Sequence, residues 1–200
     1  MAMRLYFVRH GQAVEPQDWD GAEAARPLTT EGAAQMRLAA QGIAILIDAN
    51  GRGSTLAASE RITHIFSSPY VRARQTADLV AEALGLPTVS VEERTELASG
   101  CDFTQMTPLI VGNPEAAGLI FVGHEPDLSA IIGVLISPDT HAVAHVEMKK
   151  GACCRVDLSS PHVQRGANAA HTLAGRGALV WLLTAKQLAR LAPHAAEACG

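Results

Sequence analysis

Aromatic residues and charged residues are both scarce in this sequence. Only 4% of its 200 residues are Phe, Trp or Tyr and 18% are charged, whereas 48% are hydrophobic. This balance excludes an intrinsically disordered chain, because such chains combine low hydrophobicity with high net charge. The shortage of aromatic residues predicts a core of aliphatic side chains packed with small ones. A chain of this length is expected to form a single domain, residues 1–200, with a sizeable core.

An excess of positive charge is missing as well. The formal net charge is −4, which argues against a nucleic-acid partner because binding to nucleic acid needs a basic face. The N-terminal segment "MAMRLYFVRHG" has too short an apolar run, with arginines inside it, to be a signal peptide. No apolar run approaches the length that spans a bilayer. We therefore expect a cytoplasmic protein that has no membrane partner and binds any anion through a few local cations.

The four cysteines show no CxxC spacing. Cys153 and Cys154 are adjacent, so on a strand they would point to opposite faces and would not bond each other. We interpret the cysteines as reduced thiols and expect no metal site. His141 and His145 have a spacing that could bind a metal on a helix, but no third ligand accompanies them.

Short apolar runs along the chain predict strands. Four of them are nearly continuous, as in central strands covered on both faces. They are residues 4–10, 63–68, 118–124 and 177–184. A fifth run, residues 150–158, alternates more and is predicted to be an outer strand. Two stretches rich in Gly, Ser and Ala, residues 48–61 and 159–177, predict surface loops.

Helical patterns lie between these runs. Thr30 is predicted to cap a first helix, and Ser68 a second one with Pro69 at its first position. Gly85 is predicted to end that second helix, and Pro126 to open a third. Strands that alternate with helices predict an α/β fold, a three-layer sandwich with a mostly parallel central sheet and helices on both faces.

Polar side chains follow three of the predicted strands. Arg9 and His10 end the first, Arg72 stands one turn after the second, and His124 ends the third. Ligands bind outside the carboxyl ends of strands in open α/β sheets, so these side chains are expected to converge. Arginine matches phosphate oxygens, a neutral histidine can attack phosphorus, and Gly11 lets the backbone come close to a ligand. The pattern predicts a phosphoryl-transfer site.

The segments that carry these residues resemble a known family. "VRHGQA", "SSPYVRARQTA" and "FVGHEPDLS" are similar to the three signature segments of the histidine phosphatase superfamily, which includes the phosphoglycerate mutases. "RPLTTEG", "TELASG", "MKKGA" and "ALVWLLTAKQL" look like the small SixA-type phosphohistidine phosphatases. The resemblance extends from Arg4 to about Leu188. It implies the phosphoglycerate mutase-like fold.

The resemblance also implies roles for the strand-end residues. Arg9 and Arg72 would hold the phosphate, and His10 would be the nucleophile. His124 would hold the phosphate and the transition state, and water would hydrolyse phosphorylated His10. We see no P-loop lysine and no acidic metal-binding cluster, so we expect neither a cofactor nor a metal.

A general acid is harder to assign from the sequence. In many members of the superfamily a glutamate protonates the leaving oxygen, and Glu96 in "RTELASG" stands at that position. SixA-like members are thought not to depend on such an acid. An imidazole with a conjugate-acid pKa of about 6.5 leaves far more easily than an alkoxide. Glu125 and Asp127 are interpreted as helix-capping acids.

Residues at the rim and the identity of the substrate remain open at this stage. Arg26 is a candidate rim residue that fixes the loop after the first strand, and Lys149 and Lys150 could attract an anion. The leading partner is a phosphorylated protein that carries phosphohistidine. The alternatives are a small phosphomonoester, with phosphatase or mutase activity, and a phosphoprotein-binding module without catalysis.

Overall fold

Strands alternate with helices along most of the chain. The computed structural model describes residues 2–49, 62–86, 90–137, 144–159 and 172–192. Its elements are, in order, β1 (Met3–Arg9), η1 (Pro16–Asp18), η2 (Glu23–Ala25), α1 (Thr30–Ala49), β2 (His64–Ser67), α3 (Val71–Ala83), β3 (Val91–Glu93), η4 (Thr95–Leu97), α4 (Phe103–Val111), β4 (Gly118–Gly123), α5 (Asp127–Ile136), β5 (Cys153–Leu158), β6 (Gly177–Leu183) and α7 (Ala185–Ala189).

The strands form one six-stranded sheet in the order β3-β2-β4-β1-β5-β6. The pairs β1–β4, β4–β2 and β2–β3 are parallel, whereas β5 is antiparallel to both β1 and β6. Within the described residues, β5 alone therefore runs against the other strands. The prediction of a mostly parallel sheet is confirmed. Because β4 lies between β1 and β2, the three predicted site-bearing strands are direct neighbours.

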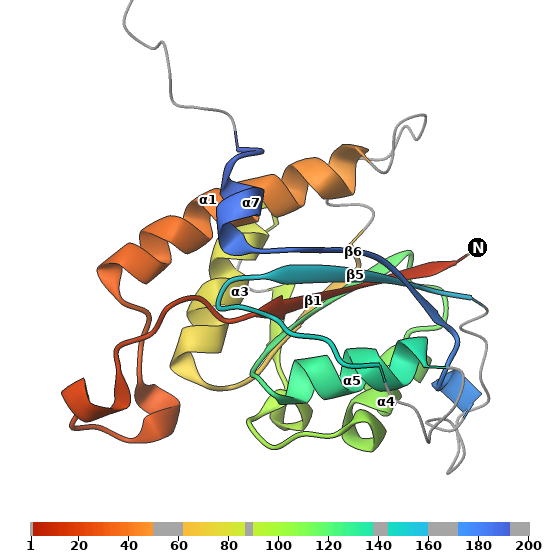
Figure 1. The fold of residues 1–200 in the computed structure, drawn as a ribbon, viewed down its shortest axis with the longest axis horizontal. Helices are drawn as coiled ribbons and strands as arrows, with labels where there is room; N and C mark the ends of the chain where they lie inside the picture. The colour runs from red at the N-terminus through yellow and green to blue at the C-terminus, as the bar shows by residue number, and fades with distance from the viewer. Residues whose placement is uncertain (1, 50–61, 87–89, 138–143, 160–171, 193–200) are drawn as a thin grey trace, which may run out of the picture.

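Helices cover both faces of this sheet, as predicted (Figure 1). α1, α3 and α7 pack on one face, and α4 and α5 pack on the other. Successive side chains of β1 point to opposite faces of the sheet and so contribute to the core on both sides. Leu5 and Phe7 point into the cluster under α4 and α5, while Tyr6 and Val8 point into the cluster under α1 and α3.

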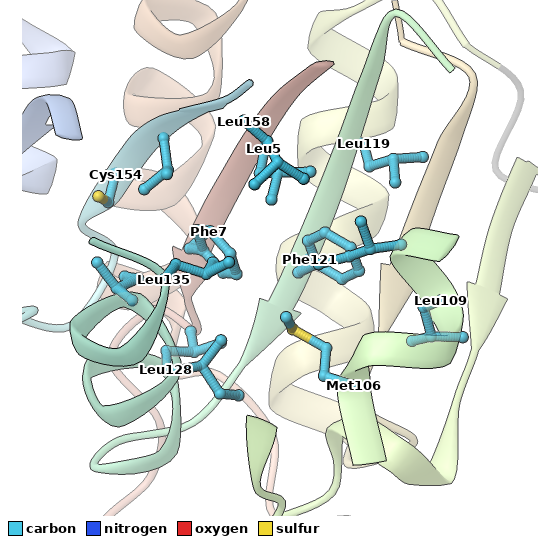
Figure 2. Packing of buried hydrophobic residues seen from close by; sticks show 14 of the residues in the cluster. Leu5, Phe7, Met106, Leu109, Leu119, Phe121, Leu128, Leu135, Cys154 and Leu158 are labelled. Atoms are coloured by element: carbon cyan, nitrogen blue, oxygen red, sulfur yellow. The ribbon is translucent and has the colours of Figure 1, made fainter. Parts of the chain in front are cut away.

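The core on the α4–α5 side is filled mainly by aliphatic side chains around a few aromatic rings (Figure 2). Phe7 of β1 stacks on its register partner Phe121 of β4, with ring centroids 5.5 Å apart. Such a pair adds about 0.5–1.5 kcal/mol beyond its area of burial. Cys153 and Cys154 are free thiols buried in opposite clusters, so the prediction that they face opposite ways is confirmed.

The predicted positions of the last two strands are wrong. β5, expected to be an outer strand, is buried between β1 and β6, and β6, expected to be central, lies at an edge of the sheet. Leu179 and Val180 of β6 are 44% and 47% exposed. The charges that made β5 look like an outer strand neutralise each other. Arg155 donates two hydrogen bonds of 2.7 Å to the Asp157 carboxylate, and such paired charges can be buried.

Two predicted helix starts are also corrected. The helix after β2 begins at Val71 with Tyr70 as its N-cap, and Ser68 is not the cap because its hydroxyl has another partner. The first helix begins at Thr30 itself, and the hydroxyl of the preceding Thr29 accepts an N–H bond from three residues further on. Gly85 follows the end of α3 with a φ of 70°, as predicted.

Three short elements were not predicted. β3 has three residues, too few to show a period, and α7 has five. α4 does carry a signal, a capping box in which Asp102 and Gln105 bond each other's backbone N–H groups. Most of residues 48–61 and 159–177, predicted as loops, lies outside the described residues, as does Cys199.

Candidate functional site

The carboxyl ends of β1, β2 and β4 meet at one edge of the sheet. A pocket of about 290 Å³ opens there. Its lining comprises Arg9, His10, Ala13, Glu15, Pro16, Glu23, Arg26, Arg72, Ser99, His124, Glu125 and Lys150. The four residues predicted to converge, Arg9, His10, Arg72 and His124, all line this pocket.

His10 is oriented by the backbone that follows it. Its Nδ1 lies 2.8 Å from Gly11 O, and because a carbonyl only accepts hydrogen bonds, Nδ1 carries the hydrogen. Nε2 is then unprotonated, and it accepts a bond of 3.3 Å from Arg72 Nε. Burial lowers the pKa of His10 to about 4, and the positive charges of Arg72 and Arg9 act in the same direction. Its neutral imidazole therefore presents a lone pair beside a guanidinium.

Arg9 is held by a residue that is distant in the sequence. Its Nη1 donates a 2.7 Å bond to the carbonyl of Met148, which is 139 residues away in the sequence. The strand fixes the backbone of Arg9, whose N–H donates to Ala152 O. Its guanidinium thus has a defined position at the pocket wall.

Arg72 enters the pocket from the first turn of α3 and is almost fully buried. Besides its bond to His10, its Nη1 donates to the Glu23 carbonyl at 3.0 Å and its Nη2 lies 3.1 Å from the Glu23 carboxylate. Its guanidinium also stands 4.9 Å from the Tyr70 ring centroid, a cation–π distance.

His124 is oriented by a hydroxyl. Its Nε2 lies 2.8 Å from Ser68 Oγ, which in turn accepts the Tyr70 N–H at 3.3 Å. Because a hydroxyl both donates and accepts, this contact fits either neutral tautomer of His124. Burial lowers the pKa of His124 to about 3, and nearby His10 and Arg72 add to the shift. The two histidine rings are 5.1 Å apart between centroids.

Three buried polar atoms at this pocket have no hydrogen-bond partner among the described residues. They are Arg9 Nε, His124 Nδ1 and Glu125 Oε1. Buried polar groups in native proteins are nearly always paired, so unpaired ones at a shared pocket call for a ligand. Arg9 Nε and His124 Nδ1 could donate hydrogen bonds to an oxyanion, and Glu125 Oε1 could accept one from a ligand atom that carries a proton.

The acids after His124 stand at the start of α5, as predicted. Asp127 lies in the first turn of the helix and accepts the Gly100 N–H at 2.8 Å, and Glu125, which also lines the pocket, interacts with Ser129 of the same turn. Burial raises the pKa of Glu125, although Ser129 and Arg9 oppose the shift. A carboxyl with a raised pKa can hold a proton closer to neutral pH than an exposed one.

The remaining predicted residues are placed as follows. Glu96 lies in η4 within reach of the Thr95 hydroxyl and is not among the residues that line the pocket. Gly11 donates its N–H to Thr76 Oγ1 at 3.1 Å, so that group is engaged by the protein. Arg26 lines the pocket and binds the Val14 carbonyl in the loop after β1.

Of the two candidate lysines, Lys150 lines the pocket, with its Nζ 3.2 Å from a Glu15 carboxylate oxygen, and Lys149 is exposed. Sequence reasoning missed Glu23, whose carboxylate bonds both Arg26 and Arg72. An acid in an irregular loop gives no pattern that could have revealed this contact. It also missed the Ser68 hydroxyl, whose position before a proline indicated a cap.

No three His, Cys, Asp or Glu side chains gather as a metal site would require, within the part of the chain that the structure describes. His145 is exposed and belongs to a neighbouring pocket, while His141 lies outside the described residues. No helix in the described ranges is long and apolar enough to cross a membrane.

Comparisons with known proteins identify the family of this chain. The sequence model of the histidine phosphatase superfamily (branch 1) matches residues 5–111, more than half of the chain. An uncharacterized protein of Picosynechococcus sp. is 30% identical over 163 residues, which cover 81% of this chain and 89% of that protein. The phosphohistidine phosphatase SixA of Escherichia coli is 26% identical over 140 residues, covering 69% of this chain and 77% of SixA.

Mutase-like proteins and solved structures are also similar. A probable phosphoglycerate mutase, GpmB, of Serratia proteamaculans is 30% identical over 103 residues, which cover 49% of this chain but only 40% of that protein. The structure of the protein histidine phosphatase SixA complexed with tungstate superposes with a TM-score of 0.68 at 23% identity, covering 93% of this chain and 99% of that one. This likeness confirms the predicted fold.

Proposed function

This chain belongs to the histidine phosphatase superfamily, and on that premise we propose that it is a phosphatase for phosphohistidine side chains of other proteins. The phosphoryl group passes from the substrate imidazole to His10 Nε2 and then to water. The state of the His10 ring carries the proposal. Its Nδ1–H is bound to a carbonyl, and its lone pair on Nε2 lies beside Arg72, so the attacking atom is already deprotonated.

The groups around His10 are suited to stabilise the phosphoryl group during its transfer. Arg9 and Arg72 are permanently charged and would hold its equatorial oxygens, while His124 Nδ1–H would donate to one of them. Little covalent chemistry is required of the protein in phosphoryl transfer, so positioning and charge supply most of the catalysis. The reaction would need no metal for these steps.

The choice of a phosphohistidine substrate is supported by similarity and by chemistry. The SixA relative is a phosphohistidine phosphatase, and the match covers 77% of its length. An imidazole leaves without a strong acid because its conjugate acid has a pKa of about 6.5. Glu96, the acid suggested by resemblance, is not part of the pocket lining.

A trapping experiment tests the nucleophile. The protein is incubated with a peptide carrying ³²P-labelled phosphohistidine and quenched in alkali, which preserves the P–N bond. We expect label on the wild type and on His145→Ala, a control histidine outside the pocket, and none on His10→Ala. Equal labelling of His10→Ala would refute the assignment, and binding without turnover by the wild type would favour the non-catalytic module.

A small phosphomonoester is the second candidate substrate. The similarity to probable phosphoglycerate mutases favours it, although that match covers less than half of those proteins. An alkoxide is a poor leaving group and needs a proton donor. Turnover of phosphomonoesters at a rate equal to that of phosphohistidine would favour this candidate.

A further inference from the structure

A cavity of about 420 Å³, the α1–α3 cavity, lies between the beginning of α1 and the middle of α3. Of the residues that the structure describes as lining it, none also lines the pocket around His10. Its wall on α3 is one face of that helix, because positions three and four residues apart are neighbours on a helix surface. These positions are Gln75, Asp78, Leu79 and Glu82. The phosphoryl transfer proposed above uses none of them.

The α1–α3 cavity combines an apolar surface with carboxylates. Leu28 is buried, and Ala33 and Leu79 are half-buried. Asp78 is half-buried and Glu82 is exposed, so their carboxylates stand nearer to solvent than Leu28 does. A Lys or Arg side chain matches this arrangement, because its methylene stem covers apolar surface while its charged end stays near water. The chemistry of the cavity therefore favours a basic side chain.

The negative charge around this cavity is not balanced by the protein itself. Arg74 bonds both the Asp78 carboxylate, at 2.9 Å, and the Glu93 carboxylate, at 3.1 Å. Glu82 has no ion-pair partner among the residues that the structure describes. Three carboxylates and one guanidinium thus stand at or beside this wall, and the described lining residues include no Lys, Arg or His. A positive charge from another molecule would complement this excess.

The cavity adjoins the segment that follows His10. Leu28, in its wall, packs against Gly11, where a Cβ atom would come within 3.3 Å of Leu28 Cδ2. The N–H of Leu28 donates a 2.8 Å bond to Oε1 of Gln75, which lies one helical turn after Arg72. A protein bound at a standard interface covers about 800 Å² of its partner, a patch about 30 Å across. A protein that presents phosphohistidine to His10 therefore reaches this cavity as well.

We propose that the α1–α3 cavity binds a Lys or Arg side chain of the phosphorylated substrate protein. This inference rests on the proposed function, because the partner is the protein whose phosphohistidine is hydrolysed. It adds a second point of recognition, in which Asp78 and Glu82 hold the positive charge and Leu79 contacts the stem. The substrate class is thereby narrowed to phosphohistidine proteins that expose a basic residue on the face that binds this chain.

Two phosphorylated copolymers test this preference. Random copolymers of lysine with histidine and of serine with histidine are phosphorylated on histidine with phosphoramidate, and the phosphate that the enzyme releases is measured at low ionic strength. The random sequence places lysine at every distance from phosphohistidine, so the spacing in a natural substrate need not be known. For the wild type we expect kcat/KM to be about tenfold higher with the lysine copolymer, and the two values to converge in about 0.5 M salt.

Removal of the two carboxylates should remove the preference. In the double variant Asp78→Asn with Glu82→Gln, KM for the lysine copolymer should rise about tenfold while kcat stays within about twofold, since the cavity binds and does no chemistry. Turnover of phosphoramidate and of the serine copolymer should match the wild type. Ala33→Met keeps both charges but extends a side chain into the cavity. It should lose the preference as well, which separates the cavity from its charge.

Glu31→Gln is the matched control, because Glu31 is an exposed acid in the first turn of α1 that does not line the cavity. A rise in KM for Glu31→Gln as large as that in the double variant would indicate general attraction of a polycation to an acidic protein, and would overturn the inference. An unchanged double variant, or an equal loss on phosphoramidate, would do the same. Sedimentation velocity tests another occupant, since a wild-type dimer that the double variant loses would place a second copy of this chain there instead.

The proposed function and this inference fail differently. If the wild type releases phosphate neither from the copolymers nor from phosphoramidate, the proposed function fails. If it hydrolyses both copolymers with equal kcat/KM, the phosphatase proposal stands and the inference alone is overturned.

Discussion

The surroundings of His10 and of His124 differ although the two residues follow neighbouring strands of one sheet. His10 has its Nδ1 tied to a backbone carbonyl and keeps Nε2 for the pocket. His124 has its Nε2 tied to the Ser68 hydroxyl, and its Nδ1 has no hydrogen-bond partner among the residues that the structure describes. The two rings are therefore held through different nitrogen atoms, Nδ1 in His10 and Nε2 in His124.

This difference shows how one sheet edge can supply two chemical functions. The carbonyl beside His10 can only accept a hydrogen bond, so it fixes one tautomer of that ring. The Ser68 hydroxyl beside His124 can either accept or donate a hydrogen bond. Both rings are neutral because they are buried among arginines. The positions of the two histidines in the sequence do not distinguish their surroundings. The group that bonds each ring, a backbone carbonyl for His10 and a hydroxyl for His124, does.

The largest effect is expected when the two histidines are removed in turn. His10→Ala should lose both labelling and turnover, by at least about 1000-fold, because no other nucleophile replaces the ring. His124→Gln should still be labelled at His10, but about 100- to 1000-fold more slowly, as when one donor to a developing anion is lost. Rapid-quench labelling measures both. Comparable losses of labelling in the two variants would end the proposed division of roles.

The low pKa of His10 gives a second test. At saturating phosphoramidate, labelling at pH 5.5 should stay within about twofold of that at pH 7, whereas a nucleophile of pKa 6.5 would keep only about a tenth. Labelling should fall roughly tenfold per pH unit below about pH 4. The free energy of unfolding should also fall as pH drops from 6.5 towards 4, because His10 binds a proton in the unfolded chain over this range but not in the folded protein. Urea unfolding of wild type and His10→Gln measures this slope.

The hydroxyl on His124 offers a more subtle perturbation. Ser68→Ala leaves both histidines present but removes the bond that orients His124, and we expect a loss of turnover of up to about tenfold. Ser67→Ala is a matched control, since its equally buried hydroxyl donates to the Ser68 carbonyl and touches neither ring. A loss in Ser67→Ala as large as that in Ser68→Ala would show that the effect is structural.

The smallest effect is expected at the rim. Glu23 is 54% exposed in its side chain and places a carboxylate on Arg72, where an oxyanion would have to bind. Glu23→Gln should therefore strengthen inhibition by tungstate, by up to about fivefold, the scale of an exposed ion pair. Glu93→Gln, which removes a partly exposed acid bound to Arg74, is the control. Weaker inhibition in Glu23→Gln would show that this carboxylate supports the site.

Much of the fold and of the site's position follows from the sequence. Continuous apolar runs identify β1, β2 and β4, and the topology of parallel sheets brings Arg9, His10, Arg72 and His124 to one edge. These predictions succeed because they depend on burial and strand direction, and the pattern of apolar and polar residues along the sequence indicates both. The order of β5 and β6 was missed because Arg155 and Asp157 made a buried strand look exposed.

The finer details of the site could not be predicted because they depend on contacts between distant segments. Ser68 was predicted to cap a helix because serine before proline often does so. Its actual partner, His124, reaches it only when β4 packs beside β2. Glu23 meets Arg72 across 49 residues. Glu125 was interpreted as a capping acid, since a carboxylate before a helix favours the dipole, and its burial became visible only with α5 and the segment before β5 in place.

The strand order also has a consequence for synthesis of the chain. β1 and β2 are joined in the sheet through β4, which pairs with both, and the Arg9 guanidinium bonds to Met148, which comes much later in the sequence. A nascent polypeptide that ends before residue 118 therefore lacks His124 and also lacks β4, the parallel partner of β1. The proposed site is therefore complete only late in translation, and we expect such a truncated chain to be inactive.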